Sequence, residues 1–487
     1  IHLNVYDGPL DLLCDLISRQ KIDIKDISQN SNNIKEGYLF VAIKGSNVDG
    51  HNYIDSAIKN GAKAIIVEND YSNKDITVIK VSSTEEIFCK LAINYFNNPI
   101  SKLTSIAITG TKGKTSTAFM IKTILEKNGN TVGIIGTNGV YIKDKHYKII
   151  NTTPNGYDIQ KYIQEMLDNK IEYLVMEVSS QALKYGRVKG MNFDYGIFTN
   201  LSKDHISKTE HSSMEDYIES KSKLFDMCHH GIFNLDDEHV FNMIDKKSST
   251  INTYGYNEKS DLRITDIKYI KYDHFLGIEF KTDGLIKDTF KVSSPGKFSS
   301  YNALAAILCT YMLGVTPNVI KSALVNFFVK GRVEPIKVSD KFNLIIDYAH
   351  NGISTESLIT TIREYNPKRI VTIFGCGGNK SIDRRYEMGR VSGTYSDFSI
   401  VTEDNNRFEQ FEDIAKDILK ELDKTGGKYI VIPDRKEAIK YSIEHAKEGD
   451  VILLIGKGHE DYKEINGKRT HFDEREVIQE ILEELKK

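Results

Sequence analysis

The sequence predicts an α/β protein with three domains: a small first domain, a central P-loop-type domain with a mostly parallel sheet, and a C-terminal domain with a doubly wound, Rossmann-like sheet. Two observations lead to this fold class. The chain has 487 residues, more than one hydrophobic core usually holds, because domains average about 150 residues. Short apolar segments alternate with helical patterns along most of its length, which is typical of parallel sheets covered by helices.

The composition is that of a soluble globular protein, with 40% hydrophobic and 27% charged residues. The net charge of -3 gives no general attraction to nucleic acid or to an anionic membrane, so any phosphate chemistry has to be local. We see no run of about 18 apolar residues and no secretory signal pattern, and we expect a cytoplasmic protein without membrane insertion. The five cysteines are scattered, which indicates reduced thiols and no zinc site.

The first 27 residues differ in character from the rest. Apolar residues recur with helical spacing from Leu10 to Ile17, after the turn Asp7-Gly8-Pro9. This segment resembles the N-terminus of segregation and condensation protein A, the kleisin subunit of bacterial condensin. The alternative is an amphipathic helix that packs on the first domain.

From Ser28 the pattern becomes that of an α/β domain. It predicts strands at 39–43 and 64–67 with a helix at 53–59 between them. We expect this first domain at 28–100, the central domain at 101–330 and the C-terminal domain at 331–487.

The most informative stretch is IAITGTKGKTST, residues 106–117. A buried strand runs into a Gly/Lys/Thr loop, and a helical pattern follows. Glycines allow successive backbone N–H groups to face one anion, the helix N-terminus adds partial positive charge, and Lys114 adds a mobile cation. Thr115 is placed to hold Mg²⁺ through its hydroxyl. The predicted phosphate-binding residues are Gly110, Thr111, Lys112, Gly113, Lys114, Thr115 and Ser116.

Polar residues follow several predicted strands further along the chain. Glu177 ends a strand and would face the phosphate loop, where a direct or second-sphere Mg²⁺ ligand belongs. The sequence Asn-Thr-Thr-Pro at 151–154 places two hydroxyls before a helix start, which suits an anion. Arg332 can bridge phosphates with its planar guanidinium, and Asp347, at the end of the strand 344–346, can accept hydrogen bonds from a ribose.

These motifs, in this order, resemble those of the ATP-dependent Mur ligases over about residues 28–487. The shared features include GTKGKTS, Thr-Thr-Pro, SSQALKYGRV, NALAA, Asp-Tyr-Ala-His and GKGHE. The resemblance is to members that extend the peptide of UDP-N-acetylmuramoyl-L-Ala-D-Glu, the implied substrate. It implies that a substrate carboxylate attacks the γ-phosphate of ATP to give an acyl phosphate and ADP. An amine then displaces phosphate.

The resemblance also implies roles for individual residues. ATP would contact the loop residues together with Asn302, Arg332, Asp347 and His350. The implied catalytic residues are Lys114, Lys221, His205 and Arg332. The implied metal ligands are Thr115, Glu177, His205 and Lys221, the last as N6-carboxylysine, which forms when a buried, deprotonated lysine takes up CO₂. The UDP-linked substrate would contact Ser31, Thr152, Thr153, Ser179 and Arg187.

Three loops are implied to bind the incoming amino acid. Their residues are Arg385, Asp404, Asn405, Arg407, Gly456 and Glu460. A diamino diacid requires a cation for its carboxylates and a carboxylate for its distant ammonium. The tetrapeptide Asp404-Asn405-Asn406-Arg407 is similar to the Asp-Asn-Pro-Arg of members that add meso-diaminopimelate, and lysine-adding members lack this Arg. The sequence therefore favours meso-diaminopimelate, with L-lysine as the alternative.

ATP is the expected cosubstrate, Mg²⁺ the expected cofactor and a monomer the expected state. We also expect the third domain to close during turnover. The alternatives are a lysine-adding Mur ligase, a folylpolyglutamate synthetase and a catalytically altered homologue. A condensin-associated binding protein, suggested by residues 1–27, is the alternative from a different class.

Overall fold

The computed structural model describes residues 24–486, apart from 46–47, 203–205, 207–209, 245–249 and 272–274. The chain forms two compact units. The first contains the residues up to Arg263 together with Leu304–Ile320, and the second contains Ile264–Ala303 and the chain from Lys321 onward. The kleisin-like segment lies outside the described residues, except for 24–27. None of the described helices is long and apolar enough to cross a membrane.

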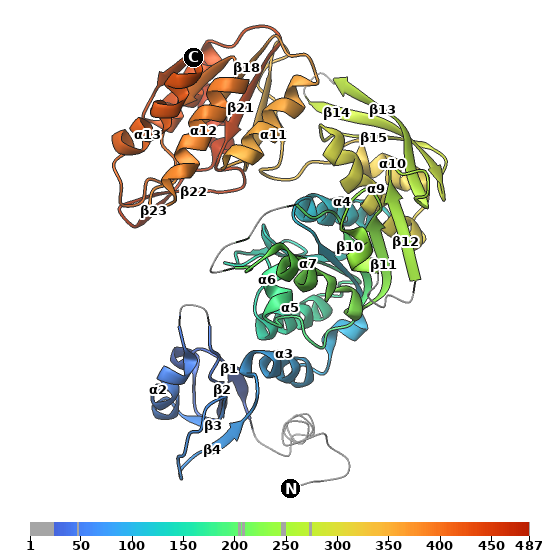
Figure 1. Cartoon of the computed structure of the whole chain (residues 1–487), viewed down its shortest axis with the longest axis vertical. Helices are drawn as coiled ribbons and strands as arrows, with labels where there is room; N and C mark the ends of the chain where they lie inside the picture. The colour runs from blue at the N-terminus through green and yellow to red at the C-terminus, as the bar shows by residue number, and fades with distance from the viewer. Residues whose placement is uncertain are drawn as a thin grey trace. The chain divides into compact units, whose positions relative to one another are not determined.

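The first sheet has four parallel strands in the order β1-β2-β3-β4, drawn in blue in Figure 1. Its elements are β1 Asp26–Ser28, β2 Tyr38–Val41, α2 Ile54–Lys59, β3 Ala62–Val67, β4 Thr77–Lys80 and α3 Thr84–Tyr95, with 3-10 turns at Ser31–Asn33 and Gly50–Tyr53. Successive residues of β2 face opposite sides: Leu39 shares a core with Phe88 of α3, and Phe40 shares one with Ala57 of α2. The two predicted strands and the predicted helix are confirmed, within two residues at each end.

The predicted phosphate loop follows β5, Thr104–Thr109, in the middle of a parallel array ordered β12-β11-β10-β5-β9-β6. Antiparallel strands β7 and β8 extend the sheet beyond β6. All five residues of β6 are buried, as in parallel strands covered on both faces. The elements are α4 Lys114–Lys127, β6 Val132–Gly136, β7 Gly139–Ile142, β8 Lys145–Tyr147, α5 Gly156–Asp168, β9 Tyr173–Glu177, α6 Ser180–Lys184, β10 Phe193–Phe198, α7 Met214–Ser222, β11 Cys228–Asn234, α8 Val240–Ile244 and β12 Thr250–Gly255, with 3-10 turns at Pro99–Lys102 and Phe225–Met227.

Strands also form between residues 250 and 294. They are β12, β13 Leu262–Lys271, β14 Leu276–Gly284 and β15 Thr289–Val292, and β14 pairs with β15 antiparallel. Two helices follow, α9 Lys297–Met312 and α10 Pro317–Leu324.

The C-terminal sheet has the strand order β16-β17-β21-β18-β19-β20, parallel except for β16. Helices α11, α12 and α13 lie together beside it in Figure 1. Ile345 and Leu453 share a core with these three helices, whereas Leu344 and Ile452 share another with α14 and α15. Both faces are covered, so the predicted doubly wound sheet is confirmed. The elements are β16 Glu334–Ile336, β17 Asn343–Asp347, α11 Gly352–Arg363, β18 Arg369–Phe374, α12 Ile382–Tyr395, β19 Phe398–Val401, α13 Phe411–Thr425, β20 Tyr429–Val431, α14 Arg435–Glu444, β21 Asp450–Ile455, β22 Tyr462–Ile465, β23 Lys468–His471 and α15 Glu474–Leu485.

Candidate active site

The chain turns sharply between β5 and α4. Gly110 (φ +149°) and Gly113 (φ +87°) have backbone conformations that favour glycine. A Cβ at Gly110 would also lie 1.9 Å from Oγ1 of Thr199, at the end of the neighbouring strand β10. The backbone N–H of Lys112 donates to the side chain of Asn200 (3.0 Å), which fastens the loop to the same place. The glycine at position 110 is therefore required by space as well as by conformation.

Two lysine side chains meet at one backbone carbonyl of this loop. Nζ of Lys114 donates to the oxygens of Gly110 (2.8 Å) and Thr111 (3.0 Å). Nζ of Lys221, on α7, donates to the same Gly110 oxygen (3.0 Å), although Lys221 is only 1% exposed. It also lies 4.6 Å from the ring centre of Tyr217. Lys114 thus adds positive charge beside the N-terminus of α4, as binding of a polyphosphate requires.

A hydroxyl and a carboxylate meet where β9 ends. Thr115, which lies with Ser116 in the first turn of α4, donates from Oγ1 to Oε2 of Glu177 (2.9 Å). The buried Glu177 also accepts from N and Oγ1 of Thr137, each at 3.0 Å. Such oxygen ligands suit Mg²⁺, which keeps water and phosphate oxygens in its shell. His205 lies outside the described residues, and those that are described include no cluster of three or more His, Cys, Asp or Glu able to hold a metal.

Four residues predicted to bind the UDP-linked substrate lie around Glu177. Oγ1 of Thr153 donates to the Glu177 backbone oxygen (2.9 Å) and accepts from the backbone N–H of Ser179 (3.0 Å). Arg187 donates to the backbone oxygen of Thr153 (3.1 Å). The fourth is Thr152, whose hydroxyl lies 3.1 Å from that of Thr137. Ser31, the fifth predicted contact, lies in the turn Ser31–Asn33, between strands β1 and β2 of the first sheet.

A half-buried carboxyl group lies near Arg187. Burial raises the pKa of Glu85, on α3, to about 7, although the charge of Arg187 opposes this shift. Burial also lowers the pKa of the Arg187 guanidinium, against the effect of Glu85. The two groups therefore influence each other's charge.

In the second unit, three of the predicted ATP-binding residues surround or adjoin Tyr348. Both carboxylate oxygens of Asp347 accept backbone N–H bonds, at 2.7 and 2.8 Å. The guanidinium of Arg332 lies 5.1 Å from the Tyr348 ring centre. Nδ1 of His350 donates to the Tyr348 backbone oxygen (2.8 Å), and burial lowers the pKa of His350, so its ring is neutral near pH 7. Asn302, on α9, is 5% exposed.

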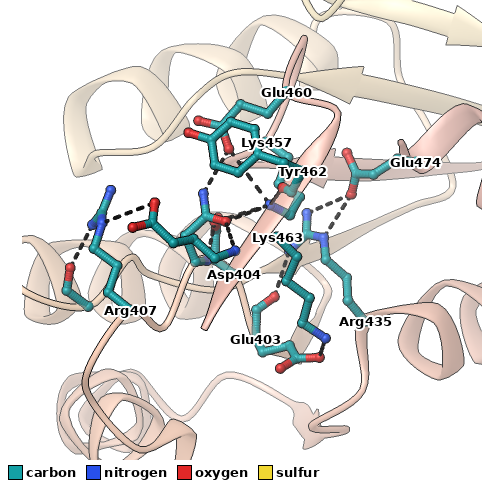
Figure 2. Close-up of polar contacts among 12 residues, drawn as sticks. Glu403, Asp404, Arg407, Arg435, Lys457, Glu460, Tyr462, Lys463 and Glu474 are labelled. Carbon is teal, nitrogen blue, oxygen red and sulfur yellow. Dashed lines mark hydrogen bonds and ion pairs between the residues drawn. The ribbon is translucent and has the colours of Figure 1, made fainter. Parts of the chain in front are cut away.

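The ends of β19 and β21 bring together predicted amino-acid-binding residues from two loops (Figure 2). Asp404 and Asn405 follow β19 and are buried. Nδ2 of Asn405 donates to Oε2 of Glu460, 55 residues further on (2.8 Å). Gly456 follows β21, and a Cβ there would lie 2.7 Å from Oδ2 of Asp404. The two loops are therefore in direct contact.

Lys457 joins these loops through a completely buried ammonium group. Its Nζ donates to Oδ1 of Asn405 (3.2 Å) and to the backbone oxygen of Tyr462 (2.8 Å). The same nitrogen lies 3.7 Å from Oδ1 of Asp404 and 3.7 Å from Oε2 of Glu460. Sequence reasoning missed Lys457, although its place in GKGHE, three residues before a predicted binding carboxylate, was a usable signal.

Lys457 affects the two carboxylates differently. Burial alone would raise the pKa of Asp404, but the charges of Lys457 and Arg435 outweigh it and hold this pKa below its usual value. Burial raises the pKa of Glu460, and Asp404 adds to this shift, whereas Lys457 and Asn405 oppose it. Glu460 is thus the group most easily protonated when the cation is lost.

Arg407 reaches the same region from the first of these loops, with a left-handed backbone (φ +52°). Its Nη1 donates to the backbone oxygen of Gly378 (2.6 Å), and its Nε lies 4.0 Å from Oε2 of Glu464 (Figure 2). Because this ion pair is long, the guanidinium of Arg407 can still bind a further carboxylate.

Arg385 forms more ion pairs within the protein than Arg407 does. It is 3% exposed, and its Nη2 donates to both carboxylate oxygens of Glu409, at 2.8 and 2.7 Å. Its Nη1 donates to Asp417 on α13 (2.9 Å). The structure therefore engages both terminal nitrogens of Arg385 within the protein.

A buried ion pair, Arg435 with Glu474, lies next to the loops that follow β19 and β21. Arg435 donates to Glu474 (2.8 Å) and to the backbone oxygens of Glu403 (3.3 Å) and Ile455 (2.9 Å). Arg435 and Glu474 are 1% and 0% exposed. Lys463, on β22, contacts the Glu403 carboxylate (Figure 2). One side chain thus ties the ends of β19 and β21 to α15.

Comparison with known proteins shows the family of this chain. Profiles match for "Mur ligase family, catalytic domain" at residues 23–99, "Mur ligase middle domain" at 108–310 and "Mur ligase, glutamate ligase domain" at 331–458. A UDP-N-acetylmuramoyl-L-alanyl-D-glutamate--2,6-diaminopimelate ligase of Clostridium perfringens is 40% identical over 468 residues, which cover 94% of this chain and 95% of the relative. The chain belongs to the Mur ligase family.

Solved structures of Mur ligases have the same fold. A UDP-N-acetylmuramoyl-L-alanyl-D-glutamate--2,6-diaminopimelate ligase matches with a TM-score of 0.69 at 26% identity, over 95% of each chain. The MurF ligase from Thermotoga maritima in complex with ADP matches with a TM-score of 0.61 at 20% identity, over 95% of this chain and 98% of that one. The predictions of a Mur ligase fold and of a Mur-type ligase are therefore confirmed. The roles of individual residues stay predictions.

Proposed function

We propose that this Mur ligase joins the D-glutamate side-chain carboxylate of UDP-N-acetylmuramoyl-L-Ala-D-Glu to an amine of meso-diaminopimelate, converting ATP to ADP and phosphate. The observation that carries this choice of amino acid is the contact between the loop with Asp404 and Arg407 and the loop with Glu460. It offers carboxylates to an ammonium and a guanidinium to a carboxylate, and the distal end of diaminopimelate has both groups. The relatives named UDP-N-acetylmuramoyl-L-alanyl-D-glutamate--2,6-diaminopimelate ligase support the same choice.

The reaction proceeds in two steps. A carboxylate oxygen of D-glutamate attacks the γ-phosphorus of ATP, and the bond to ADP breaks as the acyl phosphate forms. The amine nitrogen then attacks the acyl carbon, and phosphate leaves from the tetrahedral intermediate. Lys114, already beside the Gly110 carbonyl, is the residue of the first unit that would stabilise charge on the transferring phosphoryl group.

Thr115 and Glu177 are the proposed Mg²⁺ ligands, since their oxygens already meet. Mg²⁺, when bound, would neutralise charge on the phosphates. His205 and Lys221 are proposed as further ligands. An unmodified lysine ammonium is a donor and cannot bind a cation, so the role of Lys221 depends on carbamylation, which turns it into an anion.

The other predicted site residues are proposed as contacts for ATP and for the UDP-linked substrate. Asp347 would accept hydrogen bonds from the ATP ribose, with Asn302, Arg332 and His350 as further ATP contacts in the second unit. The peptide-bearing substrate would contact Thr152, Thr153, Ser179 and Arg187, with Ser31 as a contact for its UDP group. We propose that the enzyme acts as a monomer in the cytoplasm, where ATP and UDP-linked precursors are made.

The test is phosphate release with UDP-N-acetylmuramoyl-L-Ala-D-Glu, ATP and Mg²⁺, with meso-diaminopimelate, L-lysine or no amine. We expect release with diaminopimelate only, and a KM for this amine at least tenfold higher in Arg407→Ala. Release with lysine only would keep the ligase and overturn the choice of amino acid. No release with either amine would favour a catalytically altered homologue.

A further inference from the structure

The amide of Asn405 is held in one orientation by two donors. Nζ of Lys457 and the backbone N–H of Glu464 both point at its Oδ1, at 3.2 and 2.9 Å. Neither group can accept a hydrogen bond, so Oδ1 cannot exchange places with Nδ2. Nδ2 is therefore directed at Oε2 of Glu460 (2.8 Å), which must accept. The contacts from Lys457 through Asn405 thus fix the position of the Glu460 carboxylate and make its Oε2 a hydrogen-bond acceptor.

Glu460 shares its nearest cation. Two carboxylates, Asp404 and Glu460, lie 3.7 Å each from the single buried ammonium of Lys457 (Figure 2). Arg435 is paired with Glu474 at 2.8 Å, and Arg407 acts on Glu460 only through its charge. The Glu460 carboxylate can therefore still pair with an ammonium group of a substrate.

We propose that Lys457 is a positioning residue that keeps Glu460 ionised and oriented, so that the site selects amino acids with a distal ammonium group. This inference rests on the proposed function of the Glu460 loop. Lys457 itself does not touch the substrate, because its ammonium is enclosed by Asn405, the Tyr462 backbone and the two carboxylates.

Removal of Lys457 is expected to change the charge of Glu460. The charged and titratable groups around Glu460 are Asp404, Lys457, Arg407, Arg435, Tyr348 and Tyr462. Without Lys457, the two neighbouring carboxylates would lose the cation that they share and keep only the charges of Arg435 and Arg407, which favours the protonated form of one of them. Glu460 is that group, since burial and Asp404 already raise its pKa. A protonated Glu460 no longer attracts an ammonium at neutral pH and regains its charge as the pH rises.

The experiment compares wild type with Lys457→Met on two amines at saturating ATP and UDP-linked substrate, from pH 6.5 to 9. meso-Diaminopimelate carries the distal ammonium, and 2-aminopimelate is the same chain without it. For Lys457→Met we expect the KM for diaminopimelate to rise about tenfold at pH 7 and to fall again as the pH rises. The KM for 2-aminopimelate, the KM for ATP and kcat should change less than twofold.

The matched control is Lys463→Met, which removes a lysine of the adjacent strand β22 that contacts Glu403 instead. It should leave the preference for diaminopimelate unchanged. A KM that is unchanged in Lys457→Met, or that rises equally for both amines at every pH, would overturn the proposal and leave Lys457 a purely structural residue.

Two further outcomes are separable. Absence of product from wild type with diaminopimelate would refute the proposed function itself, whatever Lys457 does. If Lys457→Met does not fold, the wild-type ratio of the two KM values at pH 7 decides: the KM for diaminopimelate should be at least tenfold below that for 2-aminopimelate, because only diaminopimelate brings an ammonium group to Glu460. Equal KM values for the two amines would contradict the role given to Lys457.

Discussion

Arg385 and Arg384 are adjacent in the chain but differ in what surrounds them. Arg385 is enclosed, with Glu409 and Asp417 on its terminal nitrogens. Arg384 is half-buried, has no ion-pair partner among the described residues, and its charge reaches His350. An incoming carboxylate would have to compete with two protein carboxylates for Arg385, but with none for Arg384.

We therefore expect Arg385→Ala to act mainly on stability. The change leaves Glu409 and Asp417 without their cation, and the free energy of unfolding should fall by about 2 kcal/mol. Arg384→Ala should stay within about 0.5 kcal/mol of wild type. Urea unfolding measures both. Unchanged stability combined with a raised KM for the amino acid in Arg385→Ala would assign Arg385 to the substrate after all.

At the scale of elements, the turn from β5 into α4 depends on Gly110. Gly110→Ala would place a methyl group 1.9 Å from Oγ1 of Thr199, whereas Gly129→Ala, with φ +93° and nothing within 4 Å, adds only backbone strain. We expect Gly129→Ala to cost about 1 kcal/mol in unfolding free energy and leave ATP affinity unchanged. Gly110→Ala should weaken ATP binding at least tenfold in calorimetry. Equal ATP affinities in the two variants would show that the loop tolerates displacement.

The ends of β19 and β21 and the start of α15 are expected to depend on the buried Arg435–Glu474 pair. Arg435→Met leaves the fully buried Glu474 unpaired and should cost about 3–5 kcal/mol in unfolding free energy. The double variant Arg435→Met/Glu474→Leu removes the stranded charge and should recover most of that loss. A double variant as unstable as the single one would mean that the bonds to the backbone oxygens of Glu403 and Ile455 matter more than the ion pair.

At the scale of the whole molecule, Glu85 makes stability depend on pH. Its pKa rises from an ordinary 4.5 to about 7 in the folded protein. Below pH 4.5 the group is protonated in both states and contributes nothing. Between 4.5 and 7 the unfolded chain loses the proton first, so the folded state loses relative stability as the pH rises, and the loss is complete above about 7.

Glu85→Gln should therefore raise the melting temperature at pH 8, by about 2–4 °C, and have no effect at pH 4. Glu86→Gln, at the neighbouring half-exposed position that pairs with Lys189 (2.9 Å), is the control for charge removal from α3. Thermal melts at the two pH values check this. An equal rise at both pH values would point to a packing effect of glutamine instead of a titration.

Most of the fold could be predicted because the spacing of apolar residues within a short segment determines whether that segment forms a strand or a helix. The strand at 344–346 and the helix at 53–59 are examples, and the motifs at strand ends follow from the parallel order. What the sequence could not give are the partners of individual charges. Lys457 meets Asn405 across 52 residues, and Arg385 meets Asp417 across 32, through the packing of α12 on α13. Such contacts depend on register and rotamer, which motif spacing does not encode.

The most direct test of the central claim is a competition between amino acids in one reaction. Wild-type enzyme, ATP, Mg²⁺ and UDP-N-acetylmuramoyl-L-Ala-D-Glu are incubated with equal concentrations of meso-diaminopimelate and L-lysine, and the nucleotide product is identified by mass spectrometry. We predict a product carrying diaminopimelate almost exclusively. A product that carries mainly lysine, or no extended product at all, would contradict the assignment of the loops around Arg407 and Glu460 to a diamino diacid.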